Sequence, residues 1–528
     1  MGWYDVPRPI VPDLIVQHGR NQAGKPALLC GERRWTWSGF DAATNQVANG
    51  LLQLGLAPGA RLAVLMQNSA EMALLLFGAG KAGVSVVPLN TSVNDAAVAA
   101  MVHDSGATAV AASGEHCRRV DALLATGQWP GTMVKLGVDV PAAGHWTEVT
   151  PWLARQSTAA PAARVVPEAE CNIIYSSGTT GLPKGIVHTH GCRYDWGTDL
   201  AIALRYRSDC VTVCSLGLYS NISWVAMLCT IVVGGTIVVL PAFSAASLAD
   251  AIERHRVTHG GFVPVQFQRL LELPGIETRN LASLRAIMCC GSPLPAPLKR
   301  ATRATLDCEL IELYGLTEGI ITTLAPEDFD GHLESVGKPI PGQQLKLVRD
   351  DDIEAAPGEL GEICGHGRLV MEGYHNRPEA TAEATWVDPE GRRWLRTGDI
   401  GRLDADGFLY IVDRKKDMIL SGSQNVYPAD IEAVMRNHPA VTDVAVIGVP
   451  SRRWGETPLA LVVAAADSGA PAAAVLVEWT NQRVGKQQRL AGAVYVAELP
   501  RNPNGKILKR ELRQRYADWE KDSDHARD

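Results

Sequence analysis

The chain has 528 residues, of which 46% are hydrophobic and 20% are charged, and its formal net charge is −7. At about 150 residues per domain, this length predicts roughly three or four domains, or fewer large ones, with ample material for sizeable cores. The charge is too small to indicate a nucleic-acid partner or a membrane surface as partner, so neither is expected.

The eleven cysteines form no pair of Cys-x2-Cys motifs and no Cys/His cluster. We therefore expect no disulfide framework and no zinc site, but reduced and mostly buried thiols in a cytoplasmic protein. The N-terminal residues lack the basic and apolar regions of a signal peptide. The most apolar stretch, 225–240, is short for a membrane span and contains Gly234-Gly235, so a buried helix followed by a strand is predicted.

Apolar strand-like runs alternate with helical patterns between Cys171 and Leu313. Such alternation predicts an α/β fold with substantial parallel sheet. The expected strands are 172–175, 211–214, 236–240, 260–263, 284–289 and 309–313, and the expected helices are 247–255, 265–273 and 295–304.

The pattern changes after Arg402. A hairpin is expected over 403–412 around Asp406-Gly407, followed by a charged cluster at 413–417 and a helix that starts near Pro428. With further strands at 444–449, 459–465 and 494–497, this predicts a separate small α+β domain of roughly 110 residues.

The segment from Tyr175 to Gly185 reads Tyr-Ser-Ser-Gly-Thr-Thr-Gly-Leu-Pro-Lys-Gly and follows an apolar strand. Its glycines allow backbone N–H groups to approach an anion, its hydroxyls add donors, and Lys184 adds a positive charge, a combination that suits a polyphosphate. A Walker loop ends in Gly-Lys-Ser/Thr, whereas here Pro183 precedes the lysine and Gly185 follows it.

A second segment, Glu312-Leu313-Tyr314-Gly315-Leu316-Thr317-Glu318, ends a predicted strand. An aromatic ring beside a glycine can stack on a base, and a carboxylate close to phosphates requires a cation such as Mg²⁺, which prefers oxygen ligands. Alone, this segment would be read as a strand-end turn with a solvated glutamate.

These segments, together with 291–295, 394–399 and 499–507, lie in the order found in the adenylate-forming superfamily. The chain resembles its acyl-CoA synthetases, the adenylation domains of peptide synthetases and firefly luciferase, and is most similar to the acid:CoA ligase branch. The resemblance implies a large N-terminal α/β domain of several subdomains with parallel sheets, residues 1–413, and a small mobile C-terminal α+β domain, residues 414–528. The hinge is expected near Lys416.

The resemblance also implies roles for individual residues. Nucleotide contacts are expected from Ser176, Ser177, Gly178, Thr179, Thr180, Gly181, Gly291, Ser292, Glu312, Tyr314, Asp399 and Arg414. Lys506, Glu318, Thr317 and Lys184 are expected to be catalytic, with Mg²⁺ held by Glu318 and Thr180. In this scheme Tyr314 packs on adenine and Asp399 accepts hydrogen bonds from both ribose hydroxyls.

The expected acid pocket departs from many CoA ligases, because Ser220 stands where they carry a histidine. Its members are Tyr219, Ser220, Asn221, Gly261, Cys290, Leu313, Gly315 and Ile320. Two glycine positions suggest room for a bulky cyclic or aromatic acid, unless these glycines serve backbone packing instead. Ser220 and Asn221 are candidates for binding a polar substituent.

The residues for the thiol step match the family less well. Gly422 and Trp454 match positions along the CoA tunnel, but Ser423 replaces a second glycine, and 487–490 reads Gln-Gln-Arg-Leu without the family's Lys and Pro. The resemblance implies that ATP and Mg²⁺ are used, with CoA as a cosubstrate. A carboxylic acid would form acyl-AMP and pyrophosphate, and then a CoA thioester.

Three alternative functions stay open from the sequence. The adenylate could instead pass to a separate carrier protein or partner ligase, and the chain could be an inactive nucleotide-binding regulator or a luciferase-type oxygenase. The simultaneous presence of Lys184, Glu318, Asp399 and Lys506 argues against an inactive protein. A homodimer is also left open.

Overall fold

The computed structural model describes residues 8–129, 133–140, 145–176, 183–421, 424–465, 469–501 and 505–519. The chain divides into two compact units. Unit 1 comprises Met1–Gln344 and His366–Leu395, and unit 2 comprises Leu345–Gly365 and Arg396–Asp528. This division differs from the predicted boundary after residue 413, because unit 2 also includes strands that precede the charged cluster.

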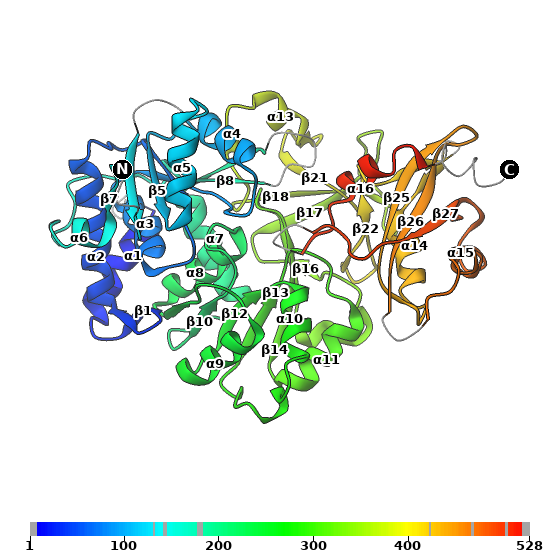
Figure 1. Cartoon of the computed structure of the whole chain (residues 1–528), viewed down its shortest axis with the longest axis horizontal. Coiled ribbons are helices and arrows are strands. Elements are labelled where there is room, and N and C mark those ends of the chain that lie inside the picture. The colour runs from blue at the N-terminus through cyan, green and yellow to red at the C-terminus, as the bar shows by residue number, and fades with distance from the viewer. Residues whose placement is uncertain are drawn as a thin grey trace. The chain divides into compact units, whose positions relative to one another are not determined.

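The first sheet of unit 1 runs in the order β16-β15-β14-β13-β12-β10-β11-β1-β2 (Figure 1). From β1 to β14 each neighbouring pair along this order is parallel. The carboxyl ends of β12, β13 and β14 therefore meet at one edge, where ligands commonly bind in such sheets. The strands are β1 (Pro26–Cys30), β2 (Arg33–Thr36), β10 (Val211–Cys214), β11 (Thr236–Val239), β12 (His259–Phe262), β13 (Ala286–Cys289), β14 (Glu309–Gly315), β15 (Ile321–Leu324) and β16 (Lys338–Pro339).

The second sheet of unit 1 runs in the order β19-β9-β8-β4-β3-β5-β6-β7. The strand predicted at 172–175 is part of β8 and lies in this sheet, not beside the other strands predicted between Cys171 and Leu313. The strands are β3 (Arg61–Leu65), β4 (Ser85–Pro88), β5 (Ala109–Ser113), β6 (Val134–Val138), β7 (Thr147–Glu148), β8 (Glu170–Tyr175), β9 (Gly185–Thr189) and β19 (Gly373–Tyr374).

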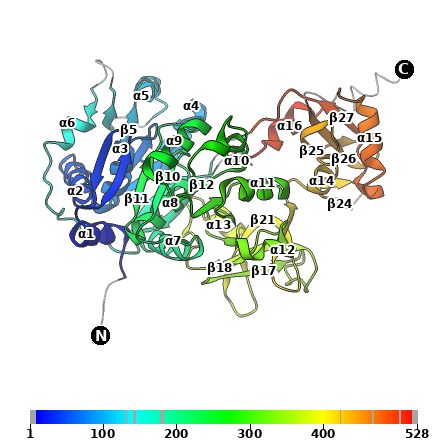
Figure 2. The same ribbon diagram turned by 90° about the horizontal axis from the view of Figure 1, so that it is seen from below.

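Helices connect and cover both sheets of unit 1 (Figure 2). They are α1 (Val11–Asn21), α2 (Trp37–Gln53), α3 (Ala70–Lys81), α4 (Asp95–Ser105), α5 (Glu115–Ala125), α6 (Val149–Leu153), α7 (His190–Ala203), α8 (Asn221–Val233), α9 (Ala245–His255), α10 (Pro264–Leu271), α11 (Ala296–Leu306), α12 (Phe329–His332) and α13 (Pro378–Glu383). Short 3₁₀ turns, η1 (Ile276–Thr278) and η2 (Pro326–Asp328), and the strand β20 (Thr385–Val387) complete the unit.

Helices α7 and α8 pack against each other between the two sheets, since α7 contacts β8 and β9 whereas α8 contacts β10, β11 and β12. Helix α8 begins after Ser220, whose side chain accepts a hydrogen bond from the N–H of Ile222, and it ends at Gly234, which has a φ of +68°. The predicted buried helix and following strand are thus confirmed as α8 and β11. No helix among the described residues is long and apolar enough to cross a membrane.

Unit 2 contains most of a sheet built from β17 (Gln343–Val348), β18 (Gly361–Gly367), β21 (Arg393–Leu403) and β22 (Leu409–Arg414). Its second sheet runs in the order β24-β23-β26-β25, with β27 beside β26. These strands are β23 (Ile419–Ser421), β24 (Gln424–Val426), β25 (Val441–Ser451), β26 (Gly455–Ala464) and β27 (Gly492–Tyr495). The helical elements are α14 (Pro428–Met435), α15 (Ala473–Asn481), η3 (Lys486–Gln488) and α16 (Lys509–Arg515).

Strand β25 explains why helices cover both faces of this second sheet. Val444 and Val446 belong to a core shared with Ile431 of α14, whereas the alternate residues Ala445 and Ile447 belong to a core shared with α16. Side chains alternate between the faces of a strand, so a run of apolar residues needs cover on both sides. The small α+β arrangement predicted for this region is confirmed.

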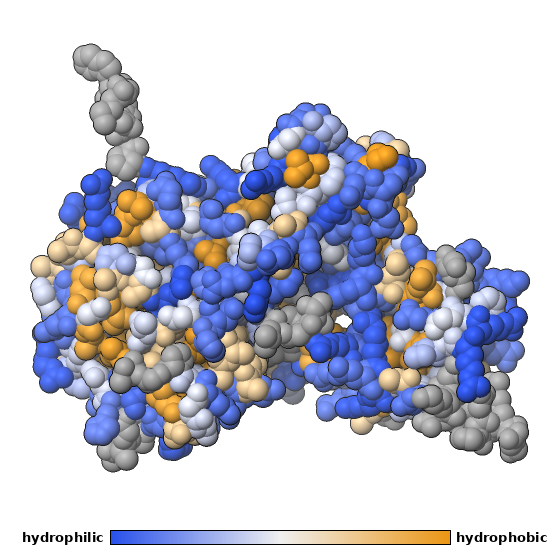
Figure 3. Space-filling model, turned by 90° about the horizontal axis from the view of Figure 1, so that it is seen from above, coloured by the Kyte–Doolittle hydropathy of each residue, from blue (hydrophilic) through white to orange (hydrophobic). Residues whose placement is uncertain are grey.

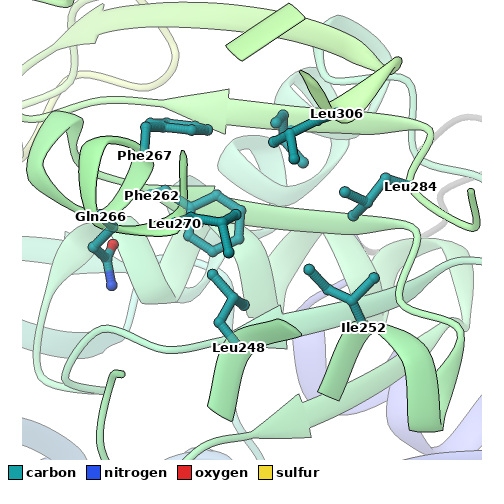
Figure 4. A pocket seen from close by; sticks show the side chains of 9 residues that line it. Leu248, Ile252, Phe262, Gln266, Phe267, Leu270, Leu284 and Leu306 are labelled. Atoms are coloured by element: carbon teal, nitrogen blue, oxygen red, sulfur yellow. The ribbon is translucent and has the colours of Figure 1, made fainter. Parts of the chain in front are cut away.

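A small cavity lies between α9, α10, α11 and the first sheet, lined by apolar side chains such as Leu248, Phe267 and Leu306 (Figure 4). Its polar member Gln266 already bonds the hydroxyl of Ser215 and the N–H of Val263. On the face in Figure 3, apolar residues occur in small groups among polar ones, an ordinary surface for a folded domain. All eleven cysteines lie in the described ranges and are free thiols.

Gly78 allows α3 to approach α2, because a Cβ at this position would lie 2.4 Å from Cβ of Val47. We expect Gly78→Ala to lower the free energy of unfolding by about 1–2 kcal/mol, since overpacking outweighs the higher helix propensity of alanine. Urea unfolding followed by tryptophan fluorescence measures this change. Gly24→Ala is the matched control, because no atom lies within 4 Å of its added Cβ. Equal midpoints for both variants and the wild type would contradict this packing.

Candidate active site

The predicted phosphate loop connects β8 and β9, which form an antiparallel hairpin. Its central residues, Ser177, Gly178, Thr179, Thr180 and Gly181, lie outside the described residues. At the base of the loop, the N–H of Ser176 donates to the carbonyl of Lys184 over 3.1 Å. The hairpin therefore places Ser176 and Lys184 side by side, as a glycine-rich loop between two strands requires.

Tyr374 brings two predicted catalytic residues together, although the sequence reasoning did not select it. Its hydroxyl donates to Oε1 of Glu318 over 2.9 Å, and Nζ of Lys184 lies 4.7 Å from the centroid of its ring. Burial, and then the charge of Glu318, raise the pKa of Tyr374, so it remains a neutral donor. The available signal was Gly373-Tyr374, an aromatic beside a glycine as in Tyr314-Gly315.

The backbone carbonyl of Thr317 is hydrogen-bonded to a buried histidine. Nε2 of His188 donates to the carbonyl oxygen of Thr317 over 2.8 Å. Burial, and then the charge of Arg193, hold the pKa of His188 well below its usual value, so the ring is neutral. This bond links β9 to the turn after β14 and leaves the side chain of Thr317 available.

Glu312 is buried and paired inside the protein. Only 4% of the residue is exposed, its carboxylate forms an ion pair with Lys299, and it accepts a hydrogen bond of 3.0 Å from the N–H of Leu294. Burial raises the pKa of Glu312. The Glu312 carboxylate thus stabilises the loop after β13, which contains Gly291 and Ser292. Gly291 has a φ of +96°. Nucleotide contacts from these residues and from Tyr314 remain predictions.

The predicted acid-pocket residues gather around the converging ends of β12, β13 and β14. Tyr219, Ser220 and Asn221 lie at the start of α8, Gly261 in β12, Cys290 directly after β13, Leu313 and Gly315 in β14, and Ile320 directly before β15. Burial raises the pKa of Cys290 to about 12, so it is a neutral wall residue at neutral pH.

The space beside Gly261 and Gly315, the two glycines of the predicted acid pocket, is already filled. A Cβ at Gly261 would lie 2.7 Å from Cε of Met288, and one at Gly315 would lie 2.6 Å from the carbonyl oxygen of Ile320. Of the two explanations considered from the sequence, close backbone and side-chain packing accounts for these glycines. They therefore do not by themselves make the pocket roomy.

Unit 2 gathers the predicted residues of the later motifs. Asp399 and Arg414 are directly opposite in the β21–β22 ladder, and Nε of Arg414 lies 2.9 Å from Oδ1 of the buried Asp399 carboxylate. Burial, and then the charges of Arg414 and Lys416, lower the pKa of Lys506 to about 7. The pKa of Lys416 falls to about 8 through desolvation of its ammonium and the charge of Arg414.

This cationic cluster, defined as Arg414, Lys416 and Lys506 around Asp399, has more positive than negative charge. Asp417 contributes a further carboxylate, but it is paired with Arg513 at 2.7 Å. Like charges crowded in this way favour binding of an anion, which would restore the ordinary pKa of each ammonium. The cluster can therefore hold a phosphate or a carboxylate.

The neighbouring predictions have mixed outcomes. In the charged cluster predicted at 413–417, the ammonium of Lys415 pairs with Asp350 at 2.9 Å and with Glu362 at 3.2 Å. Gly422 lies outside the described residues. Trp454 is 48% exposed, and the guanidinium of Arg453 lies 4.8 Å from its ring centroid, so it is not a core aromatic.

The side chains near the predicted phosphate loop suit a magnesium ion that also binds substrate phosphates, rather than a metal site built entirely from protein ligands. The described residues contain no group of three or more His, Cys, Asp or Glu side chains suited to a metal ion. Mg²⁺ typically binds one or two carboxylates together with substrate phosphates and water. Glu318, oriented by Tyr374, offers such a carboxylate.

Comparison with known proteins identifies the family. Residues 15–375 match the model of the AMP-binding enzyme family, and 430–506 match that of the AMP-binding enzyme C-terminal domain. Long-chain-fatty-acid–CoA ligase FadD13 of Mycobacterium tuberculosis is 34% identical over 92% of this chain and 93% of its own. Fatty acid–[acyl-carrier-protein] ligase ScoC of Streptomyces coeruleorubidus is 33% identical over 94% of this chain and 95% of its own.

Solved structures give the same result. The o-succinylbenzoate CoA synthetase MenE of Bacillus subtilis, in complex with its acyl-adenylate intermediate, matches with a TM-score of 0.82 and 29% identity over 95% of this chain and 98% of that one. The same enzyme has been solved with ATP and a magnesium ion. The chain belongs to the AMP-binding enzyme family, whose members of known structure include adenylate-forming CoA ligases.

Proposed function

We propose that this protein is an AMP-forming acid–thiol ligase, which activates a carboxylic acid with ATP and then transfers the acyl group to coenzyme A. The first half-reaction forms acyl-AMP and pyrophosphate, and the second forms the thioester and AMP. The observation that carries the proposal is the cationic cluster of unit 2, because Lys506, Arg414 and Asp399 come from three separate motifs of the family and lie together.

The barrier to the first half-reaction is largely electrostatic, because a carboxylate must attack an α-phosphate that is itself negative. Charge neutralisation and in-line positioning are therefore the main needs. When bound, Mg²⁺ would neutralise phosphate charge, with Glu318 and Thr180 as its proposed protein ligands. Tyr374 orients Glu318 and contacts Lys184. Lys506 is proposed to contact the attacking carboxylate and the α-phosphate as their charge redistributes.

The second half-reaction is proposed with CoA as the acyl acceptor. Lys416 remains the proposed hinge about which the C-terminal domain turns between half-reactions, and Gly422 and Trp454 the proposed contacts of the pantetheine arm. Exposure of the Trp454 ring supports a contact with a ligand rather than with a core. Release of the adenylate to a carrier protein is the second candidate, since ScoC acts on an acyl carrier protein.

For the substrate we propose a ring-bearing carboxylic acid. MenE, which acts on o-succinylbenzoate, supports this choice, whereas FadD13 acts on long-chain fatty acids. In this chain, Tyr219 would supply an aromatic wall, and Ser220 and Asn221 the polar groups at the start of α8. The free thiols support our proposal of a reducing, cytoplasmic location.

The direct test measures ATP–pyrophosphate exchange and CoA-thioester formation side by side over ring-bearing acids, long-chain fatty acids and acetate. We expect ring-bearing acids to support both activities and acetate to support neither well. Exchange without thioester formation would select the carrier-protein alternative. If acetate or a long-chain acid exceeded every ring-bearing acid, the substrate proposal would be wrong.

Removal of the Lys506 ammonium should weaken the first half-reaction. We expect Lys506→Ala to lower ATP–pyrophosphate exchange by at least about 100-fold, the usual loss for one preorganised electrostatic contact. Arg510→Ala, which removes an exposed cation of the same unit, is the control and should leave exchange within about twofold of wild type. Unaltered exchange in Lys506→Ala would disprove the proposed role.

The lowered pKa of Lys506 predicts a pH dependence. Since its pKa in the free enzyme is about 7, the ammonium is present below this pH and is lost above it. The kcat/KM for ATP in adenylation should therefore fall by about tenfold per unit above about pH 7, because kcat/KM reports groups of the free enzyme. Lys506→Arg stays charged and should remove this decline. A wild-type profile that stays level to about pH 9 would be inconsistent with a lowered pKa.

A further inference from the structure

Arg193 is a buried cation at the contact between α7 and α8. The residue has 0% exposure, and its guanidinium carbon lies 5.3 Å from the ring centroids of both Trp196 and Trp224. Nε donates to Oδ1 of Asn172 over 3.2 Å, and Nη1 donates to Oδ1 of Asn221 over 2.9 Å. Arg193 thus joins β8 of the second sheet to the first residue of α8.

Other buried cations of unit 1 are paired with carboxylates, as Lys81 is with Asp41 and Lys299 with Glu312. Arg193 forms no ion pair with any described residue, and its Nη2 has no hydrogen-bond partner among them. Burial lowers its pKa to about 10, so it is charged at neutral pH. A buried charge without a counter-ion is costly, and among the described residues amide oxygens and aromatic rings stabilise this one.

The guanidinium determines which way the side-chain amide of Asn221 points. Arginine can only donate hydrogen bonds, so Asn221 must turn its oxygen toward Nη1. Its NH₂ group therefore points away from Arg193. Asn221 is partly exposed, and it follows Ser220, whose side chain is already engaged in capping α8. Among the polar side chains at this end of the predicted acid pocket, Asn221 thus offers a donor of fixed orientation.

We propose that Nδ2 of Asn221 donates a hydrogen bond to an acceptor oxygen that the acid carries away from its reacting carboxylate, and that Arg193 is the positioning residue that sets this polarity. This inference rests on the proposed function and specifies its substrate class. Acids with a ring carbonyl, ether or second carboxylate oxygen are preferred over the same skeleton with an amine or a methylene at that place. The unneutralised charge of Arg193 strengthens the preference for an electron-rich oxygen.

The test uses three acids of one ring skeleton that carry a ketone, a methylene or an amine at the same position. For the wild type, kcat/KM for adenylation should be at least about tenfold higher with the keto acid than with the methylene acid, since a site built to hydrogen-bond rejects a substrate that lacks the partner. Asn221→Asp replaces the donor by an acceptor of equal size and gives Arg193 a counter-ion. This variant should invert the order of preference, so that the acid carrying the amine is used best.

Arg193→Met should remove the orienting bond and reduce the keto preference to within about twofold, mainly through KM, whereas Arg193→Lys should restore part of it. Asn45→Asp is the matched control, because it makes the same change beside another buried cation. Asn45 lies in α2, and its Oδ1 accepts a hydrogen bond of 2.8 Å from the ammonium of Lys81 in α3. This control should leave the order of the three acids unchanged.

Two results would overturn this inference alone: equal use of the three acids by the wild type, or an Asn221→Asp enzyme that keeps the wild-type order. Because Asn221→Asp is isosteric, it decides the matter even if Arg193→Met does not fold. Absence of exchange with every acid in the wild type would overturn the proposed function, and this inference with it.

Discussion

The ion pair between Asp399 and Arg414 is the interaction on which the proposed chemistry of unit 2 depends. The β21–β22 ladder places the two residues opposite each other, so a buried carboxylate and a guanidinium meet at 2.9 Å. Arg414 lies with Lys416 and Lys506 around Asp399, and desolvation of both ammonium groups, followed by the charge of Arg414, lowers the pKa values of the two lysines. A bound anion would raise both pKa values again, so the cluster suits an enzyme that handles phosphate and carboxylate together.

In unit 1, hydrogen bonds and ring contacts hold predicted catalytic residues from distant parts of the sequence in fixed orientations. Tyr374 contacts Lys184 from the phosphate loop and Glu318 from the turn after β14. His188 supports the carbonyl of Thr317 in the same turn. Tyr374 thus fixes the carboxylate of Glu318, and His188 fixes the backbone of Thr317, two residues predicted to be catalytic. Such preorganisation lowers the cost of reaching the transition state.

Much of the fold could be predicted from the sequence because the relevant patterns are local. The strand expected at 211–214 is β10 to the residue, and the apolar run before Gly234-Gly235 is a buried helix. The assignment of β8 to the second sheet could not be predicted, since strand order depends on long-range packing. Tyr374 was missed for the same reason: its contacts depend on the pairing of β19 with β9.

The candidate site shows a similar limit. Motif order identified the residues of the cationic cluster, but it could not show that Glu312 is paired with Lys299 or that Met288 fills the space beside Gly261. Nor could it distinguish Arg193, one arginine among many, from a surface cation. These features depend on neighbours that are far apart in sequence, and only the folded chain brings them together.

The central claim is that the energy of ATP is captured as an acyl-adenylate, and identification of the enzyme-bound intermediate tests it most directly. Enzyme, a ring-bearing acid, Mg²⁺ and ATP labelled at the α-phosphate are mixed without CoA, quenched, and analysed by chromatography. Labelled acyl-AMP is expected in an amount close to that of the enzyme, with pyrophosphate released. Formation of ADP, or of an acyl phosphate that carries no label, would contradict it.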